Sequence, residues 1–255
     1  MTVTFQTFLI VCPLLFLAGF VDSIAGGGGL ISLPAYLFAG LPIHSAIATN
    51  KFSSTFGTSL ATARFIKQKL VKVKIAIPSA ICGIVGSTIG AKLSLLVSED
   101  VLKFMLLGVL PAAAFCVLNK KLFKSNDESN IYTESNRKTI IVAVTAAFII
   151  GIYDGLYGPG TGTFLIIAFT VFAGMSAASA NAHTKVINLS TNIAALVVFI
   201  MNGQVLFTIG IAAAASNMLG NYIGSGLVMT AGSKIVKPVI IIVLLLLLLK
   251  IIIGF

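Results

Sequence analysis

Four charged side chains lie inside long apolar stretches of this sequence. Asp22 and Asp154 each precede a glycine-rich segment, and Lys51 and Lys185 each lie in a segment rich in small polar residues. A lysine at the centre of a bilayer costs roughly 2.5–3.5 kcal/mol, so each one requires a partner or a function. The lysines predict a cationic site for an anion. The alternatives are an internal ion pair with Asp22 or Asp154, and snorkelling toward the interface.

Glycine-rich segments follow both aspartates. Glycine permits left-handed φ values and close backbone approach, and successive N–H groups that open onto a helix N-terminus form a concavity that binds anions. The alternative is that these glycines only let helices pack closely, as we expect for the Gly-xxx-Gly pairs at 86–90 and 220–224. The residues predicted to bind substrate are Gly26, Gly27, Gly28, Gly29, Asn50, Lys51, Gly158, Gly160, Thr161, Gly162, Thr184 and Lys185.

Asp22, Asp154 and His183 are predicted either to couple transport to protons or to pin the broken helices. An aspartate ahead of a helix N-terminus commonly caps it by accepting N–H bonds, whereas a desolvated carboxylate can titrate near neutral pH. Capping is the favoured role for the aspartates. His183 neighbours the second lysine segment, so contact with substrate or protons is one interpretation and a structural role is the other. Two isolated histidines, His44 and His183, predict no metal site.

Polar residues also recur at helical spacing beside each lysine. The rows are Asn50, Ser54 and Gly57 in the first segment, and Thr184, Asn188 and Thr191 in the second. Residues at i, i+4 and i+7 line one face of a helix. A pore-facing stripe and a set of hydrogen bonds between helices are equally compatible with this pattern.

The elements that carry these residues are predicted to be membrane helices. Of 255 residues, 58% are hydrophobic and 9% are charged, whereas a soluble domain carries roughly 25% charged residues. A spanning helix needs about 20 residues, so the stretches at 29–41 and 161–174 are too short, and we leave open whether they re-enter or cross. The apolar stretches are 3–22, 29–41, 43–63, 75–97, 101–118, 138–157, 161–174, 176–201, 205–230 and 235–254. They predict an all-α polytopic membrane protein with about 8–10 membrane segments.

The sequence contains two copies of one pattern. Gly19, Asp22 and Gly26 match Gly151, Asp154 and Gly158 at an offset of 132, and Lys51, Gly86 and Gly90 match Lys185, Gly220 and Gly224 at an offset of 134. Placing the basic segments on the cytoplasmic side satisfies the positive-inside rule and gives each copy an odd number of crossings. The copies are therefore predicted to be inverted repeats, each with a glycine-broken short helix; parallel repeats, which would place Lys234 and Lys237 outside, rank second. The expected division is an N-terminal membrane repeat at 1–118, a cytoplasmic linker at 119–138 and a C-terminal membrane repeat at 139–255.

The motifs resemble those of a known family. The run Gly19-Phe-Val-Asp-Ser-Ile-Ala-Gly-Gly-Gly-Gly29, followed by Ala48-Thr-Asn-Lys-Phe52, is similar to the signature of the sulfite exporter TauE/SafE family of permeases. The run Gly151-Ile-Tyr-Asp-Gly-Leu-Tyr-Gly-Pro-Gly-Thr-Gly162, with His183-Thr-Lys185, resembles that family's C-terminal motif. The resemblance covers nearly the whole chain. It implies export of small sulfur-containing anions such as sulfite or sulfonates, and location in a bacterial plasma (inner) membrane.

The leading prediction is a transporter that binds its anion at the midplane, between the broken helices and the lysines. The alternatives are an anion channel and a transporter of another small organic anion. No Gly-x-Ser-x-Gly, His-Glu-x-x-His or Walker-type motif is present, so we expect neither an enzyme nor a cofactor. The net charge of +10 comes mostly from loop residues that act as topology signals. We therefore expect a small anionic substrate and the lipid bilayer as partners, no nucleic acid, and leave a homodimer open.

Overall fold

Helices make up the regular structure of the described part of the chain. The computed structural model describes residues 4–102, 104, 105, 108 and 136–231, and these residues form helices and no strand. The long helices are α1 (Phe5–Ala25), α3 (Ile43–Lys67), α4 (Val73–Ser94), α6 (Arg137–Leu156), α8 (Ala177–Met201) and α9 (Phe207–Ala231); the short ones are α2 (Gly29–Phe38) and α7 (Thr161–Val171). The all-α prediction is confirmed.

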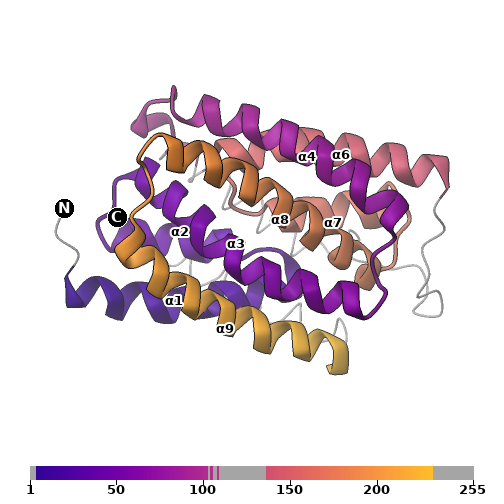
Figure 1. Cartoon of the computed structure of the whole chain (residues 1–255), viewed down its shortest axis with the longest axis horizontal. Coiled ribbons are helices and arrows are strands. Elements are labelled where there is room, and N and C mark those ends of the chain that lie inside the picture. Colours follow the sequence, from indigo (N-terminus) through magenta and orange to yellow (C-terminus); the bar gives the residue numbers. More distant parts are fainter. Residues whose placement is uncertain (1–3, 103, 106–107, 109–135, 232–255) are drawn as a thin grey trace.

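Four of the described helices, α1, α4, α6 and α8, are long and apolar enough to cross a membrane by length and composition. The short helices α2 and α7 have 10 and 11 residues, about 15 Å at 1.5 Å per residue, which is half of a hydrocarbon core of roughly 30 Å. Both α1 and α3 begin at the left of Figure 1, so α2 returns the chain toward the side from which α1 starts. The predicted stretches at 101–118 and 235–254, and the linker at 119–138, lie largely outside the described residues.

Two helices in the second half of the chain begin with a side-chain N-cap. The Asn136 side chain accepts a hydrogen bond from the Thr139 N–H at 2.8 Å at the start of α6. The Ser176 hydroxyl accepts one from the Ser179 N–H at 3.3 Å at the start of α8. Asparagine and serine are favoured at this position because they satisfy an N–H group that has no partner within the helix.

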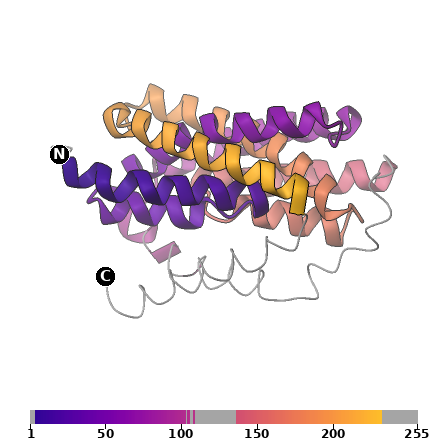
Figure 2. The ribbon, with the colours of Figure 1, turned by 90° about the horizontal axis from the view of Figure 1, so that it is seen from below.

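Helices from the two halves pack against each other in a reciprocal way. Helix α1 lies along α9 in both views, and α4 packs on α6 (Figures 1 and 2). Small residues let the backbones approach closely, and a Cβ on any of the four predicted packing glycines would collide with the facing helix. The facing pairs are Gly86 with Phe148, Gly90 with Ile152, Gly220 with Phe16, and Gly224 with Phe20. Each pair in one half matches a pair in the other at the offsets of the sequence repeat.

Helices α3 and α8, which carry the two repeated lysines, cross in opposite directions. Near the start of α3, the Lys51 ammonium contacts Asn192 of α8 at 3.1 Å. Near the end of α3, the Thr62 hydroxyl donates to the Lys185 carbonyl at 3.1 Å. The contact therefore moves toward the start of α8 as it moves toward the end of α3, which brings both lysines to the helix–helix interface.

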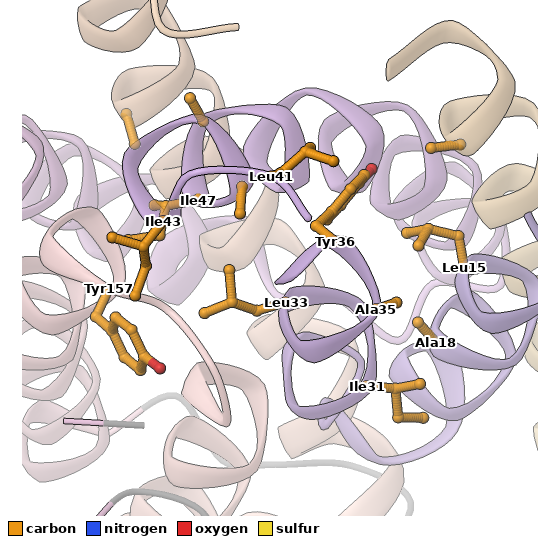
Figure 3. Close-up of a cluster of buried hydrophobic side chains, with 14 of the residues drawn as sticks. Leu15, Ala18, Ile31, Leu33, Ala35, Tyr36, Leu41, Ile43, Ile47 and Tyr157 are labelled. Atoms are coloured by element: carbon orange, nitrogen blue, oxygen red, sulfur yellow. The ribbon is translucent and has the colours of Figure 1, made fainter. Parts of the chain in front are cut away.

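The short helix α2 is held between α1 and α3 by apolar packing. Figure 3 shows Leu33 and Tyr36 of α2 within a cluster that includes Leu15 of α1 and Ile47 of α3. These four side chains are buried. The Tyr36 hydroxyl, which needs a partner in this apolar setting, donates to Ser53 of α3 at 2.9 Å. The cluster fixes where α2 begins, and so fixes the position of the glycine turn before it.

Candidate functional site

Two breaks in the helices form the centre of the candidate site. Helix α1 ends at Ala25 because Gly26 takes a φ of 74°, and α2 starts at Gly29. Helix α7 starts directly after Gly160, whose φ is 83°. Glycine reaches this left-handed region without the steric cost that other residues meet. Helices α2 and α7 therefore both begin at a break inside the bundle, and each N-terminus carries a partial positive charge.

The two breaks touch each other through their backbones. A Cβ on Gly26 would overlap the backbone of Gly162, and a Cβ on Gly162 would overlap the backbone of Gly26. The Thr163 hydroxyl of α7 donates to the Ala25 carbonyl at the end of α1, at 3.2 Å. This contact joins the two halves of the chain at the point where both are irregular, and it needs glycine on both sides.

Each buried lysine is paired with the aspartate of the other half. The Lys51 ammonium lies 2.8 Å from Asp154 Oδ2 and donates to Asn192 Oδ1. The Lys185 ammonium lies 2.7 Å from Asp22 Oδ2 and also donates to the Asp22 carbonyl. The internal ion pair, one alternative that the sequence left open, is thus present twice. Lys185 holds the Asp22 carboxylate, and Lys51 holds the Asp154 carboxylate. Among the described residues, neither carboxylate accepts a hydrogen bond from an N–H group of the glycine turns before α2 and α7.

A small polar cavity lies between the breaks and the crossing of α3 and α8. It offers about 20 Å³ to the centre of a water molecule, which is room for one or two waters. Its lining contains charged, amide, hydroxyl and glycine residues and no apolar side chain. The lining residues are Asp22, Gly26, Gly29, Asn50, Lys51, Ser54, Asp154, Gly158, Thr161, Gly162, Asn188 and Asn192. Most of the residues singled out in the sequence are therefore brought together.

Some of the residues singled out do not border this cavity. They are Gly27, Gly28, Gly160, Thr184, Lys185 and His183. Thr184 is fully buried, and its hydroxyl has no hydrogen-bond partner among the described residues. Lys185 reaches the cavity only through its partner Asp22, which does border it.

His183 links the start of α8 to the loop between α3 and α4. Its Nδ1 donates to the Ser179 carbonyl at 2.8 Å, and its Nε2 accepts from the Lys72 N–H at 3.0 Å. Both ring nitrogens are therefore engaged by the backbone, as in a neutral imidazole that carries its proton on Nδ1. This geometry favours the structural interpretation of His183 over contact with substrate.

The cavity also contains residues that were not among those predicted to bind substrate. Ser54 and Asn188 belong to the two polar rows, and Asn192 lies at i+4 from Asn188 in the second. A search at i, i+4 and i+8 spacing would have included Asn192. The rows therefore face the cavity in part and do not serve only to join helices.

Asn181 was not among the site residues predicted from the sequence. Its side-chain amide donates to the carbonyls of Ser23 and Ile24 at 3.1 and 3.2 Å, which have lost helical partners because α1 ends at the glycine turn. The matching position in the first half is Ile47, so comparing the repeats gave no signal. The Asn181 amide thus supplies the hydrogen bonds that these two carbonyls lack because α1 ends there.

Replacing Asn181 by alanine should lower the free energy of unfolding by about 1–3 kcal/mol, because two buried carbonyls lose their donor. Asn202→Ala is the matched control, since Asn202 lies at the exposed end of the same helix and its amide donates to Val198. Thermal unfolding of the purified protein in detergent measures both. Equal shifts in Tm for the two variants would contradict this role.

The fold and the site define a membrane transporter: a bundle of apolar helices, two of them interrupted by glycine, that encloses charged side chains around a polar cavity. A sequence model of the family described as sulfite exporter TauE/SafE matches residues 11–251. The chain belongs to this family, and its expected membership is confirmed.

Curated relatives agree with this class. A probable membrane transporter protein, ORF9, from a Sinorhizobium species is 38% identical over 225 residues, which cover 88% of this chain and 84% of the relative. The probable membrane transporter protein YfcA of Escherichia coli K12 is 36% identical over 250 residues, covering 93% and 89%. A probable membrane transporter protein of Haemophilus influenzae is 31% identical over 226 residues, covering 88% and 86%. No solved structure matches the chain. These names agree with the predicted location in a bacterial plasma (inner) membrane.

Proposed function

We propose that this protein exports small sulfur-containing anions, such as sulfite or sulfonates, and binds them in the polar cavity beside Lys51. The observation that carries the proposal is the convergence of a lysine, side-chain amides and two helix N-termini on one cavity. A sulfur oxyanion carries several acceptor oxygens, which match several donors better than a single point charge does. The family description points to the same substrates.

The ammonium of Lys51 and the helix N-termini at the breaks are the groups that can attract an anion. The two lysines balance the two aspartates in formal charge. The N-termini of α2 and α7 add a further partial positive charge, roughly half an elementary charge each. The C-terminal ends of α1 and α6 at the same breaks carry the opposite partial charge, and the ionised side chains that border the cavity are Asp22, Asp154 and Lys51. An anion that enters must therefore compete with Asp154 for the ammonium of Lys51.

The cavity is too small for the proposed substrate in the described arrangement. Room for one or two waters is less than sulfite or a sulfonate requires. Binding therefore requires the helices around the cavity to move apart, or a carboxylate to leave its lysine. We take the arrangement to be a closed state of a transport cycle.

We further propose that the halves are inverted repeats that move against each other around the cavity. The opposite directions of α3 and α8 support this, as does the reciprocal packing of α1 on α9 and α4 on α6. Rocking of one repeat against the other would expose the cavity to each side in turn. The membrane potential favours exit of a monoanion by about 2.3 kcal/mol per 100 mV, roughly a fifty-fold gradient.

Counterflow in proteoliposomes tests this function. Vesicles that contain the purified protein and a high internal concentration of unlabelled sulfite or sulfoacetate should accumulate the radiolabelled anion, whereas protein-free vesicles should not. Unlabelled acetate at the same concentration should compete weakly. Accumulation of acetate and of neither sulfur anion would contradict the substrate class. Uptake that internal substrate does not stimulate, together with a steady anion conductance, would identify a channel instead.

A further inference from the structure

The two buried lysine–aspartate pairs occupy matching places in the sequence repeat but differ in their surroundings. We propose that they have separate roles: Lys51 leaves Asp154 to bind the transported anion, while Lys185 stays on Asp22 throughout the cycle and holds the end of α1. This inference rests on the proposed function and assigns the accessible cation of the site to one lysine.

The contacts of Lys185 are those of a fixed clamp. Its ammonium donates to both the carboxylate and the backbone carbonyl of Asp22, and that carbonyl also accepts the N–H of Gly26 at 2.8 Å. A cation on the terminal carbonyls of a helix is favoured by the helix dipole. Lys185 thus binds the last turn of α1 at two points, both on Asp22. Removing it would release the glycine turn.

The contacts of Lys51 are more easily exchanged. Its ammonium borders the cavity, and among the described residues its ion-pair and hydrogen-bond partners are side chains, Asp154 and Asn192. Its ion-pair partner Asp154 Oδ2 lies 2.8 Å from the ammonium. An oxyanion in the cavity can replace the carboxylate without breaking a backbone contact.

The residues beside the two lysines also differ, and this difference again favours Lys51 as the anion-binding lysine. Beside Lys51 the cavity presents the amides of Asn50 and Asn192. At the repeat offset of 134, the matching positions are Thr184 and Thr58. Both threonines are fully buried, neither borders the cavity, and neither hydroxyl has a hydrogen-bond partner among the described residues. The amide donors that suit an oxyanion are thus present on the side of Lys51 and absent at the matching positions around Lys185.

Paired neutral substitutions separate the two roles, because removing both charges leaves no unpaired ion in the bundle. In the full chain, Asp22→Asn with Lys185→Gln should lower sulfoacetate counterflow by only about fivefold, since the two amides join α1 to α8 more weakly than the ion pair while the cation beside the cavity remains. Lys51→Gln with Asp154→Asn should lower it by about a hundredfold or more, because the anion loses its cation. Comparable Tm values and size-exclusion profiles establish that both proteins are folded. Equal losses in the two pairs, or a greater loss in the Asp22/Lys185 pair, would overturn the proposal.

A second measurement does not depend on the substrate. In a chain with Cys12, Cys82 and Cys116 replaced by alanine, Lys51→Cys with Asp154→Asn is compared with Lys185→Cys with Asp22→Asn. A small, permanently charged methanethiosulfonate should modify residue 51 at least about tenfold faster, since a buried thiol that solvent cannot reach is inert. Equal rates, or faster modification at residue 185, refute the assignment. If wild type transports no sulfur anion while residue 51 still reacts faster, the proposed function fails and the inequality of the pairs stands.

Discussion

Lys51→Gln should abolish sulfoacetate counterflow, with a loss of about a hundredfold or more. The single substitution removes the cation beside the cavity and leaves the Asp154 carboxylate buried without its partner. Breaking a buried pair in this way costs about 3–5 kcal/mol, and the remaining negative charge repels an anion. Both effects act against binding, so we expect this substitution to have the largest effect on transport of any single change at the site.

Lys92→Gln is the matched control for this experiment. Lys92 is an exposed lysine in the last turn of α4 and does not border the cavity, so counterflow should stay close to wild type. Rates are compared at equal amounts of folded protein, judged by size exclusion. Counterflow within threefold of wild type for Lys51→Gln would remove Lys51 from the site.

Of the proposed substitutions, Gly26→Ala should lower the free energy of unfolding most. Alanine at a φ of 74° incurs about 1–2 kcal/mol from the left-handed conformation. Its Cβ would also overlap the backbone of Gly162, which adds about 1–3 kcal/mol if the helices shift to make room. We therefore expect a marked fall in Tm in detergent and a reduced yield of folded protein.

The neighbouring glycine supplies the control. A Cβ on Gly27 would meet the Thr163 hydroxyl at 3.5 Å, an ordinary contact, and Gly27 has no positive φ. Gly27→Ala should therefore be tolerated, although the two residues are adjacent in one glycine run. Similar Tm values for the two variants would show that the breaks do not meet as described.

The sequence repeat corresponds to equivalent helix contacts in the two halves, and its unmatched positions show where the halves differ. Residues that match across the halves, such as Gly90 and Gly224, occupy equivalent contacts with the opposite half. Residues that do not match, such as Asn181 and Ile47, mark where the halves differ. The unmatched amides on α3 and α8 make the cavity unequal, and this inequality is the basis for distinguishing the two lysines.

Local properties of consecutive residues determined the elements of this protein. Apolar length predicted the helices because each needs a continuous run of such residues. The glycine runs predicted where α1 ends and where α2 and α7 begin, because only glycine adopts the required backbone readily. The sequence also identified the four buried charges, since ionisable residues inside apolar stretches are rare enough to stand out.

Tertiary structure alone decided how those charges are paired and which of them the cavity reaches. Lys51 is far from Asp154 in sequence, and their contact depends on how α3 crosses α8 and where α6 ends. The same crossing places Asn192 beside Lys51, and it places His183 on the backbone of the α3–α4 loop, away from the cavity. Helix crossings arise from the packing of many side chains at once. No short motif contains that information, so the sequence offered both aspartates as partners of the lysines without assigning either one.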